Sequence, residues 1–303
     1  MMTNLLRRTV LVGVLASLAA ATGMAAELQS RTLAAFDRYA RVTEARMSSD
    51  GSFLWVDGLS ESARRASLDA LRRGEVVIER LTTREATSGA GPRGPRERGA
   101  SWGQGPHDPN NDAGHRIDVP DGLIHHWVGL VFIPGATVDQ ALALLQDYDR
   151  HAEIYRPAVT RSKLRARDGD IFRVYLRFSM TKVITVVVNT ENEARFARLG
   201  PDRAQTRIYS TRIAEVEEPD TPRERESPVG RDGGYLWRLY TYWRFLQRDG
   251  GTYVQCESIS LTRGIPAGFG WLVGPFVTSI PRESLEFTLH TTRTTLARRG
   301  EGG

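Results

Sequence analysis

Three ionisable side chains stand on strand-like segments among apolar residues: His126, Arg212 and Glu257. Side chains alternate between the two faces of a strand. This alternation groups His126 with the apolar residues of 124–132, and Glu257 with those of 259–261. Arg212 falls on a face with apolar residues of 208–216. The pattern predicts that all three side chains point inward.

Buried charged groups rarely stay unpaired, so we expect an internal Arg212–Glu257 ion pair. Such a pair could anchor the headgroup of a ligand. It could also act in acid/base chemistry if the pKa of Glu257 is raised. Two structural alternatives remain open: a self-satisfied pair that fixes the strand register, or a β-bulge that turns one residue outward.

The sequence predicts neither a metal nor a cofactor. His125 and His126 are adjacent on a strand and should face opposite ways, so they cannot chelate one ion. Asp147 and His151 could share a helix face, but a third ligand is missing. Cys256 is the only cysteine, which excludes an internal disulfide and a cysteine metal cluster.

The charge pattern argues against nucleic acid as a partner. The 303 residues include 41 Lys and Arg against 36 Asp and Glu, for a formal net charge of +5. The basic residues are interspersed with acidic ones and form no basic stripe. Nucleophile elbows and phosphate-binding loops are absent from the sequence.

Residues 1–26 have the layout of a signal peptide. Arg7 and Arg8 precede the apolar run 9–21, and small residues follow at 23, 25 and 26. This order is typical of a cleaved secretory signal rather than a membrane span. We therefore expect an exported, periplasmic protein, and a single thiol is compatible with that compartment.

The second half of the chain predicts a large antiparallel sheet. Seven segments rich in Val, Ile, Thr and aromatic residues are bounded by Gly, Asp or Pro. A helical region, 137–155, follows the first segment, and a long amphipathic helix, 281–297, follows the last. The helix should cover the apolar concave face of the sheet and leave a cavity. The expected strands are 123–133, 160–167, 171–180, 183–199, 204–217, 235–247 and 252–262.

The first half of the mature chain predicts an extension and a linker. Helices are expected at 27–47 and 61–73, and a strand at 75–82, so that residues 27–83 form a mainly helical N-terminal extension with one strand. Residues 84–120 are rich in Gly and Pro and poor in aliphatic residues, which predicts a flexible linker.

Two segments resemble those of START-like (SRPBCC, or helix-grip) proteins, a superfamily that includes polyketide cyclases and coenzyme-Q-binding START proteins. Residues 147–157 (DYDRHAEIYRP) resemble the stretch where short helices close onto the sheet, and 280–289 (IPRESLEFTL) resemble the start of the terminal helix. The resemblance covers roughly 121–298 and implies an α+β helix-grip fold. It also implies a cavity for a hydrophobic ligand, in a superfamily that contains both binders and enzymes.

The cavity lining follows from strand alternation in the third and sixth strands. An apolar segment, 265–277, precedes the terminal helix and could form a lid or touch a membrane transiently; its aromatic residues are Phe269, Trp271 and Phe276. The expected lining residues are Phe172, Val174, Leu176, Phe178, Leu239, Thr241 and Trp243, with the polar His126, Arg212 and Glu257.

Three functions are compatible with these features. The first is binding, with or without transfer, of a lipid, an isoprenoid or another hydrophobic small molecule in the periplasm. The second is a cyclase or aromatase that uses His126, Arg212 and Glu257 on a polyketide-like substrate. The third is an envelope interaction protein without a ligand.

Overall fold

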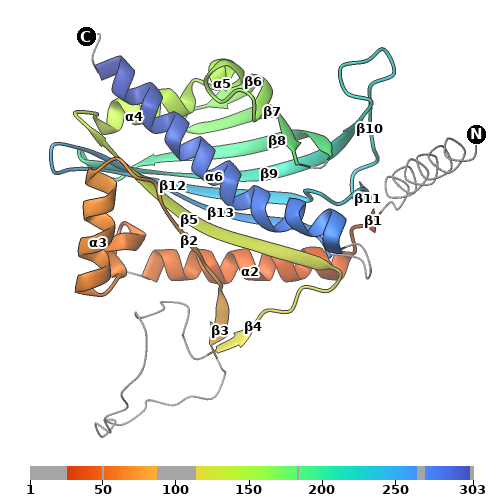
Figure 1. Cartoon of the computed structure of the whole chain (residues 1–303), viewed down its shortest axis with the longest axis horizontal. Helices are drawn as coiled ribbons and strands as arrows, with labels where there is room; N and C mark the ends of the chain where they lie inside the picture. Colours follow the sequence, from red (N-terminus) through yellow and green to blue (C-terminus); the bar gives the residue numbers. More distant parts are fainter. Residues whose placement is uncertain (1–25, 50, 87–113, 183, 265–269, 301–303) are drawn as a thin grey trace, which may run out of the picture.

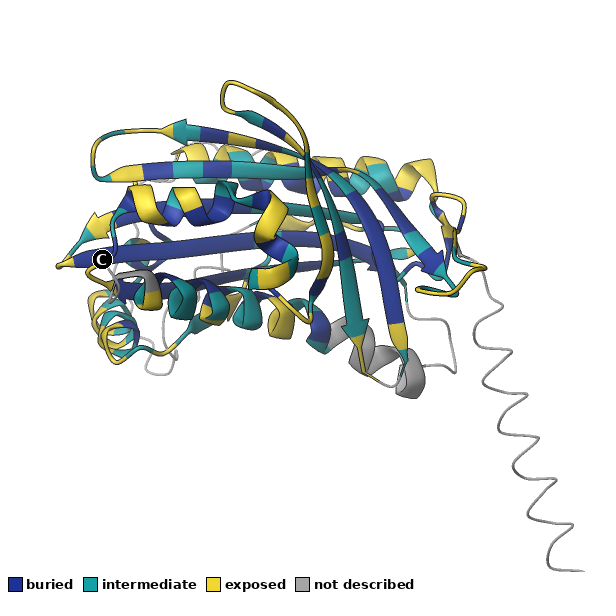
Figure 2. Ribbon diagram, turned by 90° about the horizontal axis from the view of Figure 1, so that it is seen from above, coloured by how far each residue is buried: buried dark blue, intermediate teal, exposed yellow. Residues whose placement is uncertain are grey.

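The computed structural model describes residues 26–49, 51–86, 114–182, 184–264 and 270–300. They form three layers, with one large curved sheet between two layers of helices (Figure 1). The strands are mostly buried, whereas the helices carry the exposed residues on their outward sides (Figure 2). The fold is therefore α+β, with a core on each face of the sheet.

The central sheet is antiparallel, and its described part contains nine strands. Eight follow the order β2-β5-β13-β12-β9-β8-β7-β6, and the short β10 pairs with β9. All seven strands predicted from the sequence are confirmed. The strands are β2 (Val77–Arg80), β5 (Gly122–Pro134), β6 (Val159–Asp168), β7 (Ile171–Thr181), β8 (Thr185–Arg198), β9 (Arg203–Glu217), β10 (Arg225–Glu226), β12 (Arg238–Arg248) and β13 (Gly251–Arg263).

A two-residue turn joins β12 to β13 and fixes their register. Asp249 and Gly250 both have positive φ, of 57° and 76°. Two consecutive positive φ values are the signature of a type I′ turn, whose twist matches that of the hairpin, and Asp-Gly is among its preferred pairs. The register runs without interruption from Arg248↔Gly251 to Arg238↔Leu261. Every side chain of β13 therefore has a defined face.

The terminal helix α6 (Gly270–Gly300) lies against the concave face, chiefly along β5 and β13. Its close approach requires glycine at position 129, where a Cβ atom would stand 2.5 Å from Cδ1 of Leu289. The helix begins eleven residues before the predicted start, so Pro281 lies inside it rather than at its first turn. Phe269 lies outside the described residues, and so do the side chains of Trp271 and Phe276.

The helical region predicted over 137–155 consists of three short elements. They are α4 (Val138–Gln146), the 3₁₀ turn η2 (Tyr148–Arg150) and α5 (His151–Ile154). Thr137 starts α4 with a capping box, because its hydroxyl accepts from the Gln140 N–H while the Gln140 side chain accepts from the Thr137 N–H. Asp147 ends α4 with a non-helical ψ of 55°. The chain turns there and packs against one end of the concave face.

The N-terminal segment covers the convex face, a role that the sequence did not predict. Helix α2 (Ser30–Ser49) packs Phe36 and Tyr39 on Tyr242, Ile259 and Leu261 of the sheet. The 3₁₀ turn η1 (Trp55–Gly58) and α3 (Glu61–Arg72) cover the convex side of β5 and β13 further along. The strand β2 joins the edge of the sheet beside β5. The extension is thus an integral layer of the fold.

Short strand pairs fasten the ends of this layer. The strands β3 (Arg84–Ala86) and β4 (Gly114–Arg116) pair with each other, and Ile117 and Val119 pack in the α2 cluster. Both ends of the predicted linker 84–120 therefore belong to the described fold. The strand β1 (Ala26–Glu27) pairs with β11 (Arg231–Asp232).

Candidate functional site

Seven of the predicted lining residues lie on the concave face. Phe172, Val174 and Trp243 are buried in the main core cluster beneath α6, and Leu176 packs against it. Phe178 and Leu239 pack in the neighbouring cluster with Ile280 of α6. Thr241 lies between Leu239 and Trp243 on the same face of β12, opposite Ile208 and Ser258. Alternation therefore assigned the faces of β7 and β12 correctly.

The concave face has a packed end and a more open part. At the packed end, beneath α4 and the second half of α6, the side chains are buried. Because α6 lies mainly along β5 and β13, it leaves part of β12, β9 and β7 less covered. Five residues of these strands stay half-buried although the strands are internal to the sheet. We call them the concave patch: Leu176, Phe178, Ile208, Leu239 and Thr241.

Polar side chains flank the concave patch, and the sequence reasoning did not select them. Thr190, Asn192 and Ser210 are buried on the concave side of β8 and β9, where the Asn192 amide donates to the Thr190 hydroxyl at 2.8 Å. His125 and Thr262 lie on β5 and β13, with 3.0 Å between His125 Nε2 and Thr262 Oγ1. The same alternation that groups His126 with Val128 predicts that His125 faces the other way.

Several buried polar atoms of this layer have no hydrogen-bond partner. Within the described part of the chain, six buried side-chain atoms are unpartnered, and four of them belong to the concave side. A buried polar atom without a partner costs about 1–3 kcal/mol, so such atoms call for water or a ligand. The four are Trp127 Nε1, Tyr148 OH, His151 Nε2 and Thr206 Oγ1.

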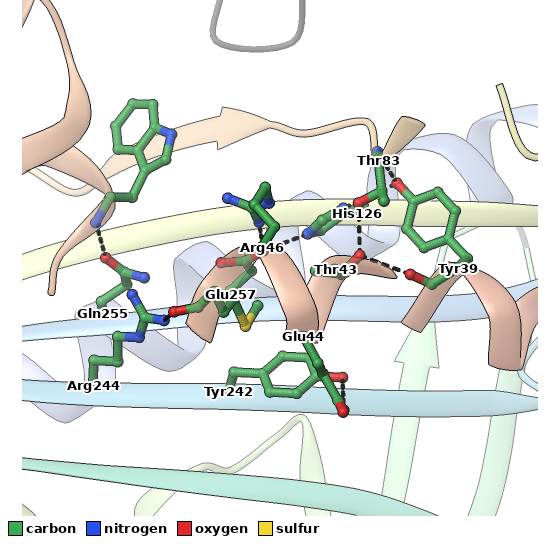
Figure 3. Close-up of polar contacts among 12 residues, drawn as sticks. Tyr39, Thr43, Glu44, Arg46, Thr83, His126, Tyr242, Arg244, Gln255 and Glu257 are labelled. Atoms are coloured by element: carbon green, nitrogen blue, oxygen red, sulfur yellow. Dashed lines mark hydrogen bonds and ion pairs between the residues drawn. The ribbon is translucent and has the colours of Figure 1, made fainter. Parts of the chain in front are cut away.

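His126 and Glu257 meet each other, but on the convex face of the sheet and not on the concave one. They share a face with Ile259, as predicted, and that face lies under α2. His126 Nε2 lies 2.7 Å from Glu257 Oε1, and Nη2 of Arg46 on α2 lies 2.6 Å from the same oxygen (Figure 3). The predicted inward direction was wrong because both faces of β5 and β13 are covered, one by α6 and the other by the N-terminal extension.

The predicted Arg212–Glu257 ion pair does not form. In β9 the register shifts so that Glu191 faces Arg212 while Asn192 faces Ser210, which leaves Thr211 as an extra residue. This β-bulge reverses the alternation beyond it and turns Arg212 to the convex side, where it pairs with Glu226. The three residues assigned to a cyclase site are therefore not brought together.

A continuous series of hydrogen bonds on the convex side joins five residues, which we call the convex network: Thr83, Tyr39, His126, Glu257 and Arg46 (Figure 3). The Thr83 N–H donates to the Tyr39 hydroxyl at 2.8 Å, and that hydroxyl lies 3.0 Å from His126 Nδ1. Tyr39 can donate to Nδ1 when the ring proton of His126 is on Nε2, which faces Glu257. Arg46 completes the chain. The network ties α2 to the sheet with every named group satisfied.

Electrostatics keep Glu257 ionised inside this network. Burial alone would raise the pKa of its carboxyl. The hydrogen bond from His126, the charge that His126 carries when protonated, and the charges of Arg46 and Arg244 outweigh burial and hold that pKa below its ordinary value. The side chain of Glu257 is 3% exposed, whereas that of Arg46 is 39% exposed. The carboxylate is thus a buried charge that depends on its partners.

Two buried histidines on the concave side should make stability depend on pH. Burial lowers the pKa of His125 to about 4, helped by the charge of Arg80, and burial also lowers the pKa of His151 to about 4. Between pH 6.5 and 4 the unfolded chain binds these protons and the folded chain does not. The free energy of unfolding should therefore fall as the pH falls, by about 1.4 kcal/mol per pH unit for each histidine.

Comparison with a His125→Gln variant isolates this effect. Glu215 works in the opposite direction, because burial and the nearby charge of Asp232 raise its pKa to about 7. Its contribution is common to both proteins and cancels in their difference. When it is measured by urea unfolding between pH 7 and pH 4, the free energy of unfolding of the variant should depend less steeply on pH. The difference in slope should be the contribution of one histidine, about 1.4 kcal/mol per pH unit. Identical slopes would show that His125 is protonated in the folded protein.

The described residues contain no group of three His, Cys, Asp or Glu side chains that could hold a metal ion. Among the helices described, none is long and apolar enough to span a membrane.

Comparisons with known proteins give similarity at the level of layout. No protein-family model matches the chain, and no curated protein is significantly similar to it. A STAR-related lipid transfer protein from Xanthomonas axonopodis is 17% identical, with a TM-score of 0.40, over 59% of this chain and 95% of its own. The Zhui aromatase/cyclase from a Streptomyces species is 13% identical, with a TM-score of 0.38, over 58% and 96%. Human STARD10 is 12% identical, with a TM-score of 0.41, over 62% and 70%.

The order and arrangement of the chain's own elements identify its fold. A strand, a group of short helices, six antiparallel strands and a long terminal helix follow one another, and the sheet curves around that helix. This is the helix-grip fold of START-like proteins.

Proposed function

We propose that this protein binds a hydrophobic small molecule, such as a lipid or an isoprenoid, on the concave patch beside α6. The carrying observation is that apolar side chains of strands internal to the sheet stay half-buried: Leu176, Phe178, Ile208 and Leu239. Covering this apolar surface with a ligand is favourable by about 25 cal/mol per Å².

The polar surroundings indicate what kind of hydrophobic molecule fits. His125 is uncharged at neutral pH because its pKa is about 4. The other polar groups beside the patch are hydroxyls, an amide and the unpartnered atoms of Trp127 and Thr206. These groups hydrogen-bond to a hydroxyl or carbonyl without supplying a compensating charge. They favour a ligand with a long apolar part and one uncharged polar end.

A variant that fills the concave patch tests the proposal. The probe is the neutral fluorophore N-phenyl-1-naphthylamine, together with mass spectrometry of organic extracts from the purified protein. Thr241→Phe fills the concave patch and should weaken probe binding at least tenfold and remove any co-purified lipid. The matched control is Thr160→Phe, which places the same side chain at an exposed position on β6. Failure of the wild type to bind the probe saturably, with empty extracts, would contradict the proposal.

Export is the second part of the proposal and rests on residues 1–26. Their charged, apolar and small-residue order is that of a signal peptide. N-terminal sequencing of the protein from its native host should begin near Ala26 or Glu27. Recovery of the intact Met1 from the cell envelope would indicate an anchor instead.

A further inference from the structure

A pocket lies on the convex side, where the end of α2 meets the sheet, and we call it the convex pocket. Its volume is about 320 Å³, at the lower end of the range for small-molecule sites. One wall is formed by residues 47–48 and 51–53, and the others come from β9, β12 and Leu199 in the turn between β8 and β9. The residues used below are Phe53, Leu199, Arg203, Arg207, Tyr242 and Arg244. The pocket therefore exists only when the N-terminal extension is docked.

Arginine holds the wall of the convex pocket in place. Arg244 donates to the Phe53 carbonyl at 2.6 Å and to the Met47 carbonyl at 3.1 Å, so it pins both ends of the segment that leaves α2. The Phe53 ring lies near two guanidinium groups, 5.7 Å from that of Arg244 and 5.8 Å from that of Arg203. An aromatic ring held by cations on the wall of a pocket is a preformed surface for a planar ligand.

Arginine dominates the ionisable lining of the convex pocket. Three arginines line it, and three carboxylates lie close to them in the described structure: Asp202, Glu44 and the buried Glu257, which Arg46 and His126 already hold. Asp202 pairs with Arg203. Oε1 of Glu44 already accepts from the Tyr209 and Tyr242 hydroxyls, and Oε2 is 4.0 Å from Arg207. Arg207 is thus weakly paired and 38% exposed, so its planar guanidinium can take a further anion.

The apolar lining of the convex pocket indicates the chemistry of the uncharged part of a ligand. Besides Phe53 and Tyr242, Leu199 contributes a side chain that is 49% exposed, an unusual level for a large aliphatic residue of this protein. We infer that the convex pocket binds a small aromatic anion, with a carboxylate or phosphate on Arg207 and the ring against Phe53. This site is separate from the concave patch, because its side chains are on the opposite face of the sheet.

Titrations with three probes test the inference, and NMR or calorimetry measures the binding. Benzoate should bind saturably, and benzamide, its uncharged analogue, should bind at least tenfold more weakly. Arg207→Gln should weaken benzoate at least tenfold, and Arg207→Lys should give an intermediate loss because it keeps the charge without the planar fork. The matched control is Arg282→Gln, an exposed arginine of α6 on the other side of the sheet, which should leave benzoate binding unchanged.

The third probe, inorganic phosphate, separates the two parts of the ligand. Phe53→Leu should weaken benzoate and leave phosphate unchanged. Equal binding of benzoate and benzamide would overturn the site as an anion site, and phosphate binding as tight as benzoate would overturn its aromatic part. Arg207→Gln should leave N-phenyl-1-naphthylamine binding intact, so failure here is distinguishable from failure of the concave patch. Each variant should give an unfolding curve like that of the wild type, which shows that the variant folds.

Discussion

Replacing Arg46 with methionine should lower the free energy of unfolding by about 3–5 kcal/mol, the usual cost of leaving a buried charge without its partner. The charge that matters is that of Glu257, which is buried under α2 and receives hydrogen bonds from Arg46 and His126. Methionine fills similar space on α2 but cannot donate. Urea denaturation monitored by tryptophan fluorescence measures the loss.

The double variant Arg46→Met/Glu257→Gln identifies the cause. It removes the charge together with its partner, and the glutamine oxygen still accepts from His126, so most of the lost stability should return. Arg41→Met is the control, because Arg41 is an exposed arginine of the same helix. A double variant that is as unstable as the single one would locate the loss in packing rather than in charge.

Replacing Phe36 with alanine should also cost about 3–5 kcal/mol, as for other fully buried aromatic residues. Phe36 has no exposed surface and makes an edge-to-face contact with Tyr240, with 5.0 Å between the ring centroids. Phe36→Leu keeps most of the apolar volume and should cost less than about 1.5 kcal/mol. Thermal unfolding should remain a single transition in both variants, since α2 and the sheet share one core.

The number of transitions is the sharper part of that test. If α2 were an appendage, Phe36→Ala would release it in a first transition and leave the melting of the sheet unchanged. The structure predicts the opposite, because α2 packs on β12 and β13 in the middle of the sheet. A biphasic melt would therefore contradict the integral role of the N-terminal extension.

The sequence predicted the strands well because hydrophobic alternation and turn residues are local signals. Alternation also placed Phe172 and Trp243 on the correct face, since the opposite faces of β7 and β12 carry Arg and Tyr. It failed for His126 and Glu257, whose strands are covered by helices on both faces. Alternation tells which residues share a face, and only the docking of α2 decides what that face meets.

Two further features could not be decided from local patterns. The β-bulge, which the sequence left open as one alternative, is at Thr211, and the partner strand in the sheet determines that shift. Arg46, Tyr39 and Glu44 sit on a helix with an ordinary amphipathic pattern, and nothing in their spacing indicates partners on the sheet. The convex network and the convex pocket depend on contacts between segments about 200 residues apart, such as Trp55 with Gln255.

The position of α2 has a consequence for the order in which the protein folds. Arg46 and Glu257 are 211 residues apart, so the helix is synthesised early and its docking surface is completed by the last strand, β13. Contacts of such long range close slowly. Until β13 forms, the apolar side of α2 has nothing to cover it and is open to aggregation. The interval between the synthesis of α2 and that of β13 is therefore the one in which the unfinished chain is most exposed to aggregation.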